Sequence, residues 1–453
     1  MGTKSIGLTE VFDRSSITLY QVRVYILCVC VTLLDGFDLM VIGVALPKIS
    51  AFLHAGSGAL GLAVGAGQMG PLVGAMVLGS LADRLGRRRV LIVSALVFGV
   101  FTLLTTRIGS VEQLAVCRFF SGLGLGGAVP NALALGCEYA PNRLRASFTT
   151  LLWSGMAMGS VVAGLVAAWL LPHHGWQSLF WVGGIPPLVV AAAVTLFLPE
   201  SLAFLARRNL HPERIRHIVS KLAPDLTQDP HTTFHSTEEQ LPGVPVKHLF
   251  TEGRTFTTLA LWGLFLLSFY LMWVMISWSP TLLRRSGASD TQASMAFAYL
   301  NLGSVVATLI IGRLMDRFNA FRLLSVAFLL SFVTVAIFGA MANRPFSTVA
   351  ALAMVTGLFI FGSNSGLMAL ATISYPVSIR TSGVGWAYAI GKVGSMFGPV
   401  AGGLLLARNW NVGRVCAVNG LSGVAAAILI LVLEWRLKTR RRSQVALAAG
   451  VNA

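Results

Sequence analysis

The chain has 453 residues, of which 55% are hydrophobic and only 11% are charged, and its mean hydropathy is +0.75. A soluble protein carries about 25% charged residues, and a soluble chain of this length splits into several domains that each need a polar surface. The charges are too few to cover such surfaces, so the composition excludes an ordinary soluble protein and predicts one embedded in a lipid bilayer.

The formal net charge of +17 is also found in proteins that bind nucleic acid, but the basic residues are distributed as in a membrane protein, and we expect no nucleic-acid partner. The five cysteines lie in or beside apolar runs without metal-ligand spacing, and the eight histidines fall outside these runs. We therefore expect buried thiols, no metal and no cofactor.

Twelve apolar runs follow one another along the chain, each close to the ~20 residues that a membrane-spanning helix needs. They predict an all-α polytopic membrane protein with twelve transmembrane helices. The polar stretch after the sixth run indicates a linker with one short amphipathic helix around 212–222 and no catalytic domain. The runs lie near residues 23–46, 58–82, 90–107, 112–137, 147–171, 177–198, 255–280, 291–313, 321–341, 346–372, 382–407 and 411–434.

Lysine and arginine decide the orientation, because they accumulate in cytoplasmic loops. With the N-terminus inside, the cytoplasmic segments hold 25 of the 34 basic residues and the opposite side holds 7. Both termini are therefore predicted to be cytoplasmic. The predicted domains are an N-terminal six-helix half at 1–198, a central cytoplasmic loop at 199–254, a C-terminal six-helix half at 255–435 and a cytoplasmic tail at 436–453.

Two short motifs repeat at matching positions of the two halves. Gly79-Ser-Leu-Ala-Asp83-Arg84 recurs as Gly312-Arg-Leu-Met-Asp316-Arg317, each after the second run of its half, and Tyr139-Ala-Pro is echoed by Tyr375-Pro, each after the fourth run. Such repetition indicates that each half is one structural unit. Two parallel six-helix halves are the architecture of major facilitator transporters, in which the substrate site lies between the halves near the midplane.

The residues that follow sharpen this resemblance. Gly79-Ser-Leu-Ala-Asp-Arg-Leu-Gly-Arg-Arg-Arg resembles the loop signature of that superfamily, and Arg118-Phe-Phe-Ser-Gly resembles its fourth-helix motif. Asp35-Gly-Phe-Asp38 in the first run resembles the aromatic acid:proton symporter family. Further matches are Pro130-Asn131, Glu138-Tyr139, Trp278-Ser-Pro280-Thr281 and Arg380-Thr-Ser-Gly-Val-Gly385-Trp386-Ala387.

The resemblance implies a secondary transporter rather than an enzyme. It implies proton-coupled import of a small aromatic carboxylate by alternating access across the bacterial cytoplasmic (inner) membrane, with the proton gradient in place of a cofactor. The expected partners are the lipid bilayer, the carboxylate and protons, and we expect a monomer.

Two acids stand near the middle of the first run, where each costs on the order of 2.5–3.5 kcal/mol on insertion scales. Asp35 and Asp38 are three residues apart and share one helix face, which suits a site that takes up and releases protons. Arg118 needs a counter-charge, and pairing with one of these acids would tie protonation to helix movement. With Glu138 they form the predicted proton-coupling set. The alternative is a structural pair bonded to a neighbouring helix.

Lys392 lies in the eleventh run without an acid in its own span, so an anionic substrate could supply the missing charge. The symporter family that this chain resembles usually has arginine at such a position. Lysine lacks the forked guanidinium that binds a carboxylate through two parallel hydrogen bonds, so it restricts the carboxylate geometry less. Snorkelling or a structural pair is the alternative. The predicted substrate-binding residues are Lys392, Tyr270, Tyr388, Asn131, Gln68, Asn301 and Trp273; tyrosine and tryptophan also form interfacial belts, and polar side chains also join helices.

The repeated loop motif has a different expected role. By resemblance, its acids make charge contacts between the halves that hold one face closed and break during the cycle. A solvated positive-inside cluster is the alternative for Arg87 and Arg88. The predicted gating residues are Gly79, Asp83, Arg84, Arg87, Asp316, Arg317 and Arg380.

Two glycine patterns point to rival functions. Gly122-Leu-Gly124-Leu-Gly-Gly127 fits a dinucleotide fingerprint, but that fingerprint needs a preceding strand, and helix packing explains it better inside an apolar run. Gly394-Ser-Met-Phe-Gly-Pro399-Val-Ala-Gly-Gly resembles a pattern from the fifth helix of drug:proton antiporters, although here it lies in the eleventh run. An efflux antiporter of aromatic or cationic compounds is therefore the alternative function, ahead of a substrate sensor or a membrane enzyme.

Overall fold

The computed structural model describes residues 5–7, 18–141, 145–207, 212–222, 233–235, 246–251, 253–375 and 379–450. Within these residues, 12 helical segments are long and apolar enough to cross a membrane, which confirms the predicted spans. They are α2 (Leu19–Leu53), α3 with α4 (Ser57–Gly67 and Met69–Leu85), α5 (Arg87–Leu104), α6 (Val111–Glu138), α7 (Arg145–His174), α8 (Gln177–Phe197), α11 (Thr255–Arg285), α12 (Asp290–Arg317), α13 (Ala320–Ala340), α14 (Phe346–Ser374), α15 (Arg380–Ala407) and α16 (Val412–Gly450).

Short elements lie outside the spans, several of them in the central loop. The amphipathic helix expected around 212–222 is present as α10 (Pro212–Leu222), preceded by α9 (Leu202–Arg207). Strand β1 (Ser5–Gly7) pairs in parallel with β2 (Thr233–His235), with Ser5 opposite Thr233. Single turns of 3-10 helix complete the set as η1 (Thr105–Arg107) and η4 (Val246–Leu249).

The chain forms two compact units. Unit 1 comprises residues 1–45 and 66–241, and unit 2 comprises residues 46–65 and 242–453. The C-terminal end of α2 and most of α3 thus pack with α11–α16 in unit 2. The division into two halves, a loop and a tail stays a prediction.

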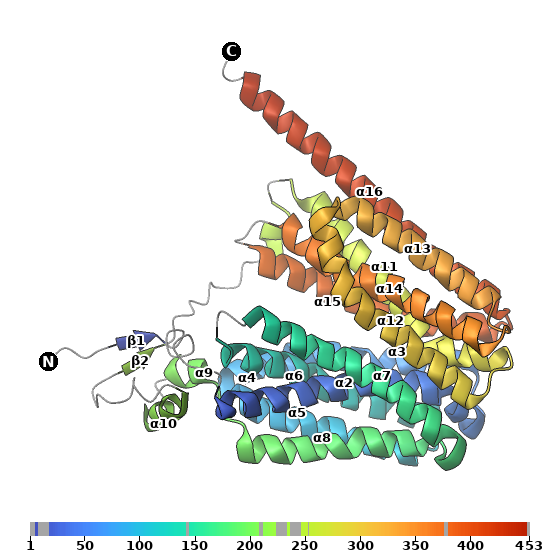
Figure 1. Cartoon of the computed structure of the whole chain (residues 1–453), viewed down its shortest axis with the longest axis horizontal. Helices are drawn as coiled ribbons and strands as arrows, with labels where there is room; N and C mark the ends of the chain where they lie inside the picture. The colour runs from blue at the N-terminus through green and yellow to red at the C-terminus, as the bar shows by residue number, and fades with distance from the viewer. Residues whose placement is uncertain are drawn as a thin grey trace. The chain divides into compact units, whose positions relative to one another are not determined.

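The same helix pairings recur in the two units, each taken by itself. In unit 1, α4 packs along α6 and α5 along α8; in unit 2, α12 packs along α14 and α13 along α16. Figure 1 shows α13 and α16 running side by side. By position in the halves these are the second with the fourth span and the third with the sixth, so the motif repeat in the sequence corresponds to a repeat in packing.

Glycines permit the closest of these crossings. A Cβ on Gly70 of α4 would overlap the carbonyl oxygen of Phe119 of α6, and a Cβ on Gly303 of α12 would overlap that of Met354 of α14. In lipid no hydrophobic effect drives helices together, so close backbone packing through small residues supplies much of the attraction. This accounts for the high glycine content of the apolar runs.

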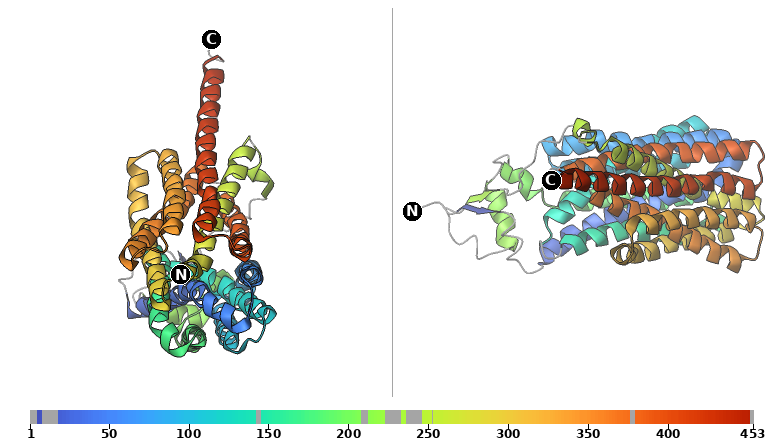
Figure 2. Two further views of the ribbon diagram at one scale, coloured as in Figure 1. Left: turned by 90° about the vertical axis from the view of Figure 1, so that its right-hand side faces the viewer. Right: turned by 90° about the horizontal axis from the view of Figure 1, so that it is seen from above.

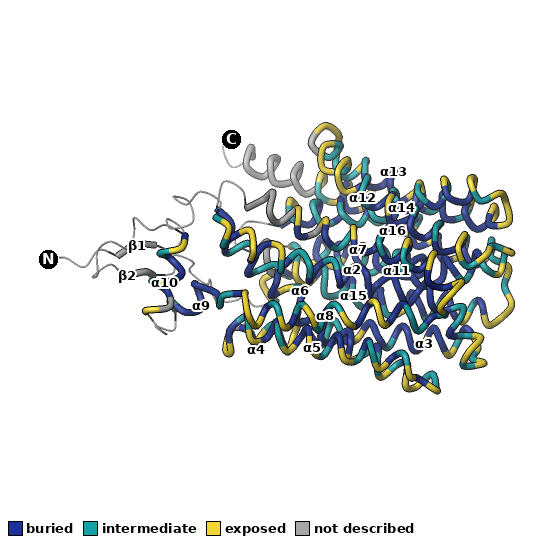
Figure 3. The backbone as a smooth tube through the Cα atoms, turned by 60° about the horizontal axis from the view of Figure 1, so that its bottom comes forward, coloured by how far each residue is buried: buried dark blue, intermediate teal, exposed yellow. Residues whose placement is uncertain are grey.

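The outer faces of the spans are apolar. Along α5, the exposed side chains Val93, Leu96, Val100 and Leu104 form one stripe, and Figure 3 shows exposed and buried positions alternating along this helix and its neighbours. An exposed apolar surface of this extent marks contact with lipid. Figure 2 shows α16 continuing past α13, which agrees with its greater length of 39 residues.

Candidate functional site

Two buried charges of unit 1 form an ion pair between α2 and α6. The Nη1 and Nη2 atoms of Arg118 donate to Oδ1 and Oδ2 of Asp38 at 2.8 and 2.6 Å, and the two side chains are only 6% and 1% exposed. A bidentate pair is the strongest form of this contact, and it leaves neither charge uncompensated in a low dielectric. The structure therefore brings together Arg118 and one of the two acids of the first span.

The second acid and the glycine between them complete this segment of α2. Asp35 is buried one helical turn before Asp38. A Cβ on Gly36 would overlap the carbonyl oxygen of Met156 in α7, and the Ser160 hydroxyl of α7 donates to the carbonyl of Gly36 at 3.2 Å. The glycine of the Asp-Gly-Phe-Asp motif thus lets α7 press against α2, which holds both acids on a closely packed segment.

The glycine-rich stretch after Arg118 packs helices. A Cβ on Gly122 would lie 2.6 Å from Cδ of Pro71 in α4, and a Cβ on Gly124 would lie 2.6 Å from the backbone nitrogen of Phe98 in α5. Since alternate glycines face two different neighbours, α6 can run close to both. These contacts support the interpretation of this pattern as helix packing.

The polar residues predicted for substrate binding in unit 1 lie within the spans. Gln68 is buried at the break between α3 and α4. Asn131 is buried in α6, and its Nδ2 donates to the carbonyl of Gly127 in the same helix at 2.7 Å. Pro130, beside it, interrupts the helix ladder because proline has no N–H. The substrate-binding role of both side chains stays a prediction.

Glu138 lies at the other end of α6, about 30 Å from Arg118 at the usual rise of 1.5 Å per residue. It pairs with Arg87 at 3.1 Å and accepts hydrogen bonds from the Ser201 hydroxyl and the Ala203 backbone N–H, each at 2.7 Å. The structure therefore does not bring Glu138 to the buried ion pair. It joins the C-terminal end of α6 to the start of α5 and the start of α9, and its proton-coupling role stays a prediction.

Glu200 extends this cluster and was not singled out from the sequence. Its carboxylate accepts from the backbone N–H of Arg88 at 3.0 Å, at the start of α5, where a helix dipole favours an anion. The Tyr139 hydroxyl donates to the Glu200 carbonyl at 2.9 Å, and burial raises the pKa of this phenol well above its usual value, so it remains a donor. The sequence signal for this contact was that Glu200 directly follows the sixth apolar run, where an acid can pair with the arginines that begin α5.

Lys392 of α15 lies among aromatic rings in unit 2. Its Nζ is 5.4 Å from the ring centre of Tyr388 and 5.8 Å from that of Phe269 in α11, and the two rings meet edge to face at 5.2 Å. Among the residues that the structure describes, no carboxylate lies within 4 Å of Nζ. Cation–π contacts contribute about 0.5–2 kcal/mol and do not neutralise the charge, so this partly buried ammonium can still accept an anion.

The other predicted substrate-binding residues of unit 2 make local contacts. The Tyr270 hydroxyl donates to Oδ1 of Asn419 at 2.5 Å. Asn301 is buried and donates to the carbonyl of Phe297 in its own helix at 2.8 Å. Trp273 is 1% exposed. Tyr388 is therefore the predicted aromatic residue that the structure shows beside Lys392, and Phe269 is the one that sequence reasoning missed.

The gating residues are described only in part. Arg84 and Arg317 are exposed at the ends of α4 and α12, and Gly79 has open space around its Cα. The side chains of Asp83, Asp316 and Arg380 lie outside the described residues. The pairing of Arg87 with Glu138 places one member of the signature loop in a charge contact within unit 1. The gating role of the set stays a prediction.

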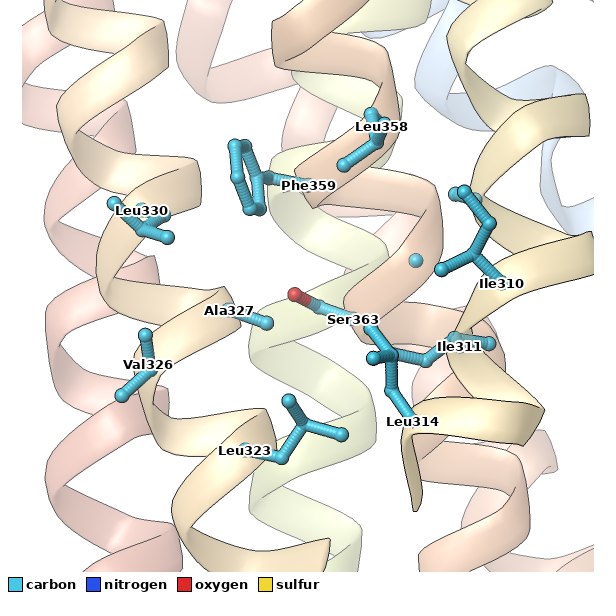
Figure 4. A pocket seen from close by; sticks show the side chains of 12 residues that line it. Ile310, Ile311, Leu314, Leu323, Val326, Ala327, Leu330, Leu358, Phe359 and Ser363 are labelled. Atoms are coloured by element: carbon cyan, nitrogen blue, oxygen red, sulfur yellow. The ribbon is translucent and has the colours of Figure 1, made fainter. Parts of the chain in front are cut away.

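An apolar pocket of about 130 Å³ lies between α12, α13 and α14 (Figure 4). Ser363 supplies the one hydroxyl among side chains such as Leu314, Ala327 and Phe359. A carboxylate needs a cation or several donors to replace its water, and none lines this space. The pocket is therefore unsuited to an anionic substrate.

Comparisons with known proteins agree with this architecture. The family description "Major Facilitator Superfamily" matches residues 28–289 and, in a second match, 261–450. The chain is 33% identical to the 4-hydroxybenzoate transporter PcaK of Acinetobacter baylyi and to the gallate transporter of Pseudomonas putida, with 94% of each chain covered in both cases. A crystal structure of a D-xylose–proton symporter superimposes with a TM-score of 0.71 at 17% identity, over 91% of this chain and 97% of the symporter.

Proposed function

This chain belongs to the Major Facilitator Superfamily, and we propose that it imports a small aromatic carboxylate together with protons. The substrate class is supported by the relatives named above, a 4-hydroxybenzoate transporter and a gallate transporter. The proposed location is the bacterial cytoplasmic membrane, with both termini inside and a monomer as the working unit. No cofactor takes part, since the proton gradient drives the cycle.

The environment of Lys392 carries this proposal. An ammonium without an acidic partner among the described residues, placed over the rings of Tyr388 and Phe269, suits a ligand that combines a negative charge with an aromatic ring. The carboxylate would complete the ion pair that the protein lacks, and the substrate ring would pack on the aromatic side chains, which prefer edge-to-face or offset contacts. A neutral sugar or a cation would leave the ammonium uncompensated.

The ion pair of unit 1 supplies the proton chemistry. Protonation of Asp38 would convert a charged bidentate pair into a weaker contact and release Arg118, and a buried cation without its partner favours a rearrangement that hydrates it. Asp35, one turn away, is the second acid through which a proton would pass. Protonation and substrate binding together would permit closure to the outside and opening to the inside, with the signature-loop residues as the gate on the cytoplasmic side.

Uptake of labelled 4-hydroxybenzoate into right-side-out membrane vesicles that contain the full chain tests the proposal. An imposed inward proton gradient should drive accumulation, and an uncoupler should abolish it. Lys392→Gln should reduce uptake by about 10- to 100-fold, the value of one charge-assisted contact of 1.5–3 kcal/mol, whereas Lys392→Arg should retain most of it. Arg414→Gln, at an exposed position near the start of α16, is the matched control.

Accumulation that resists the uncoupler, or that survives Lys392→Gln unchanged, contradicts the proposal. Proton-driven loss of substrate from preloaded vesicles would instead identify the efflux antiporter.

A further inference from the structure

A second pocket in unit 2 lies at the end of the bundle opposite to the C-terminus of α16. It measures about 250 Å³ and is formed where α2 and α11 end and α3 begins, with Leu46, Leu60, Trp278, Thr281, Arg284 and Arg285 among its lining residues. Pockets for drug-sized ligands usually measure about 300–1,000 Å³. This one is therefore sized for a smaller molecule.

The charge around the pocket is positive. Asp290 forms ion pairs with both Lys48, at 2.7 Å, and Arg284, so one carboxylate is shared by two cations. Arg285 is the third basic side chain and has no acidic partner within 4 Å among the described residues. Adjacent arginines are unusual on the non-cytoplasmic face, which the positive-inside rule leaves poor in basic residues. With three cations and one carboxylate, the surroundings of the pocket carry a net positive charge that favours binding of an anion.

Arg285 is oriented by neutral acceptors. Its Nη1 donates to the carbonyl of Leu406 at the end of α15 at 3.1 Å, and its Nη2 donates to the hydroxyl of Ser57 at the start of α3 at 2.9 Å. These bonds fix the plane of the guanidinium beside the pocket without neutralising its charge. Arginine offers five donors in a fork, so the remaining donors can bind a carboxylate.

The other lining residues suit the ring and the polar substituent of an aromatic acid. Trp278 is among the lining residues and is almost fully buried, and its indole is held in place because its Nε1 donates to the carbonyl of Pro399 at 2.9 Å. The buried hydroxyl of Thr281, also in the lining, has no hydrogen-bond partner among the described residues. Such an unpaired group costs about 1–3 kcal/mol, a cost that a bound ligand with a polar atom would remove.

We infer that this pocket is an external binding site for an aromatic carboxylate, which holds the substrate before it reaches Lys392. The inference rests on the proposed function for the identity of the acid. It repeats the chemistry of the Lys392 site, a cation without an acidic partner beside an aromatic ring, at the far end of the same unit. Capture here raises the local concentration of an anion that would otherwise approach the membrane with little attraction.

The first test compares transport from the two faces of the membrane. In right-side-out vesicles Arg285→Gln should raise the KM for 4-hydroxybenzoate about five- to tenfold, the share expected of a partly exposed charged contact, with the maximal rate nearly unchanged. In inverted vesicles the same variant should have the wild-type KM, since the substrate then enters from the other side. Arg408→Gln, an exposed arginine at the end of α15 outside the pocket, should match the wild type in both.

The second test needs no transport. Thr281→Cys places a thiol in the pocket, and its alkylation by a membrane-impermeant reagent should be slowed by 4-hydroxybenzoate but not by neutral benzamide or inorganic phosphate, with the wild-type chain and its five cysteines as the background. Protection from alkylation supports the site even if the wild type does not accumulate the acid. Failure to accumulate the acid would contradict only the proposed function. No protection, protection by phosphate alone as for a lipid headgroup, or an equal rise of KM from both faces overturns the inference.

Discussion

Replacing Asp38 by asparagine removes the counter-charge of Arg118 and keeps the size of the side chain. Arg118 donates two hydrogen bonds to the Asp38 carboxylate, at 2.8 and 2.6 Å, and Asp38 and Arg118 are 1% and 6% exposed, so water cannot solvate the guanidinium once the carboxylate is gone. Breaking a buried pair in this way costs about 3–5 kcal/mol of folding free energy, because it leaves an uncompensated charge. We expect that loss for Asp38→Asn, and a clearly smaller one for Asp38→Asn combined with Arg118→Gln, which removes both charges.

The free energy of unfolding can be measured by titrating the purified protein in mild detergent with a denaturing detergent. Lys48→Gln is the matched control, because Lys48 pairs with Asp290 at 2.7 Å but is 36% exposed; partly exposed pairs contribute about 0–1 kcal/mol. In vesicles, Asp38→Asn should lose proton-driven accumulation of 4-hydroxybenzoate yet retain exchange of labelled for unlabelled substrate, since exchange needs no net proton movement.

The reasoning would be refuted if Asp38→Asn destabilised the protein no more than Lys48→Gln does. It would equally be refuted if this variant still accumulated substrate in an uncoupler-sensitive way. A double variant as unstable as the single one would show that the cost is steric rather than electrostatic.

Three further predictions follow from the packing and the second cluster. Gly36→Ala should lower the yield of folded, monodisperse protein and cost about 1–3 kcal/mol or more through overpacking against Met156, whereas Gly79→Ala, with open space around it, should behave as the wild type in size-exclusion chromatography. Glu138→Gln should slow transport but leave the ratio of substrate inside to outside the vesicles, and its sensitivity to an uncoupler, unchanged; loss of that ratio would show that Glu138 takes part in proton coupling. Tyr139→Phe should leave the pH profile of uptake between about pH 5 and 9 unchanged, because burial raises the pKa of the Tyr139 phenol well above its usual value, so it stays protonated until the pH exceeds that range; a shifted profile would contradict this.

The spans were predictable because lipid imposes a rule that water does not. Every backbone polar group inside the bilayer must be bonded within the protein, so a run of about 20 apolar residues can only be a helix. All twelve runs, and even the short amphipathic helix α10, appear where the hydropathy pattern placed them. The repeated loop motif indicated two similar halves, and the structure adds that the helix pairings recur in the two units.

The partners of the buried charges were harder to predict from the sequence. Asp35 and Asp38 share one helix face, and the sequence does not say which of them meets Arg118; that depends on where α6 crosses α2, which the packing of glycines against neighbouring backbones decides. The separation of Glu138 from Arg118 was readable from their spacing on one helix. Its bonds to Arg87 and Ser201 were not, because they join segments far apart in the chain.

By itself, the sequence determined that this protein crosses the membrane with twelve helices, because hydropathy is a local signal, and its motifs resembled those of a transporter superfamily. It also led to the prediction that Lys392 binds an anion, which stays a prediction. Only the tertiary structure decided that Phe269 of another helix lies beside Lys392, and that Arg285, Trp278 and Thr281 line one pocket with the ends of α2 and α3. Such contacts depend on how helices cross, and crossing geometry arises from side-chain packing along whole helices rather than from any short stretch of residues.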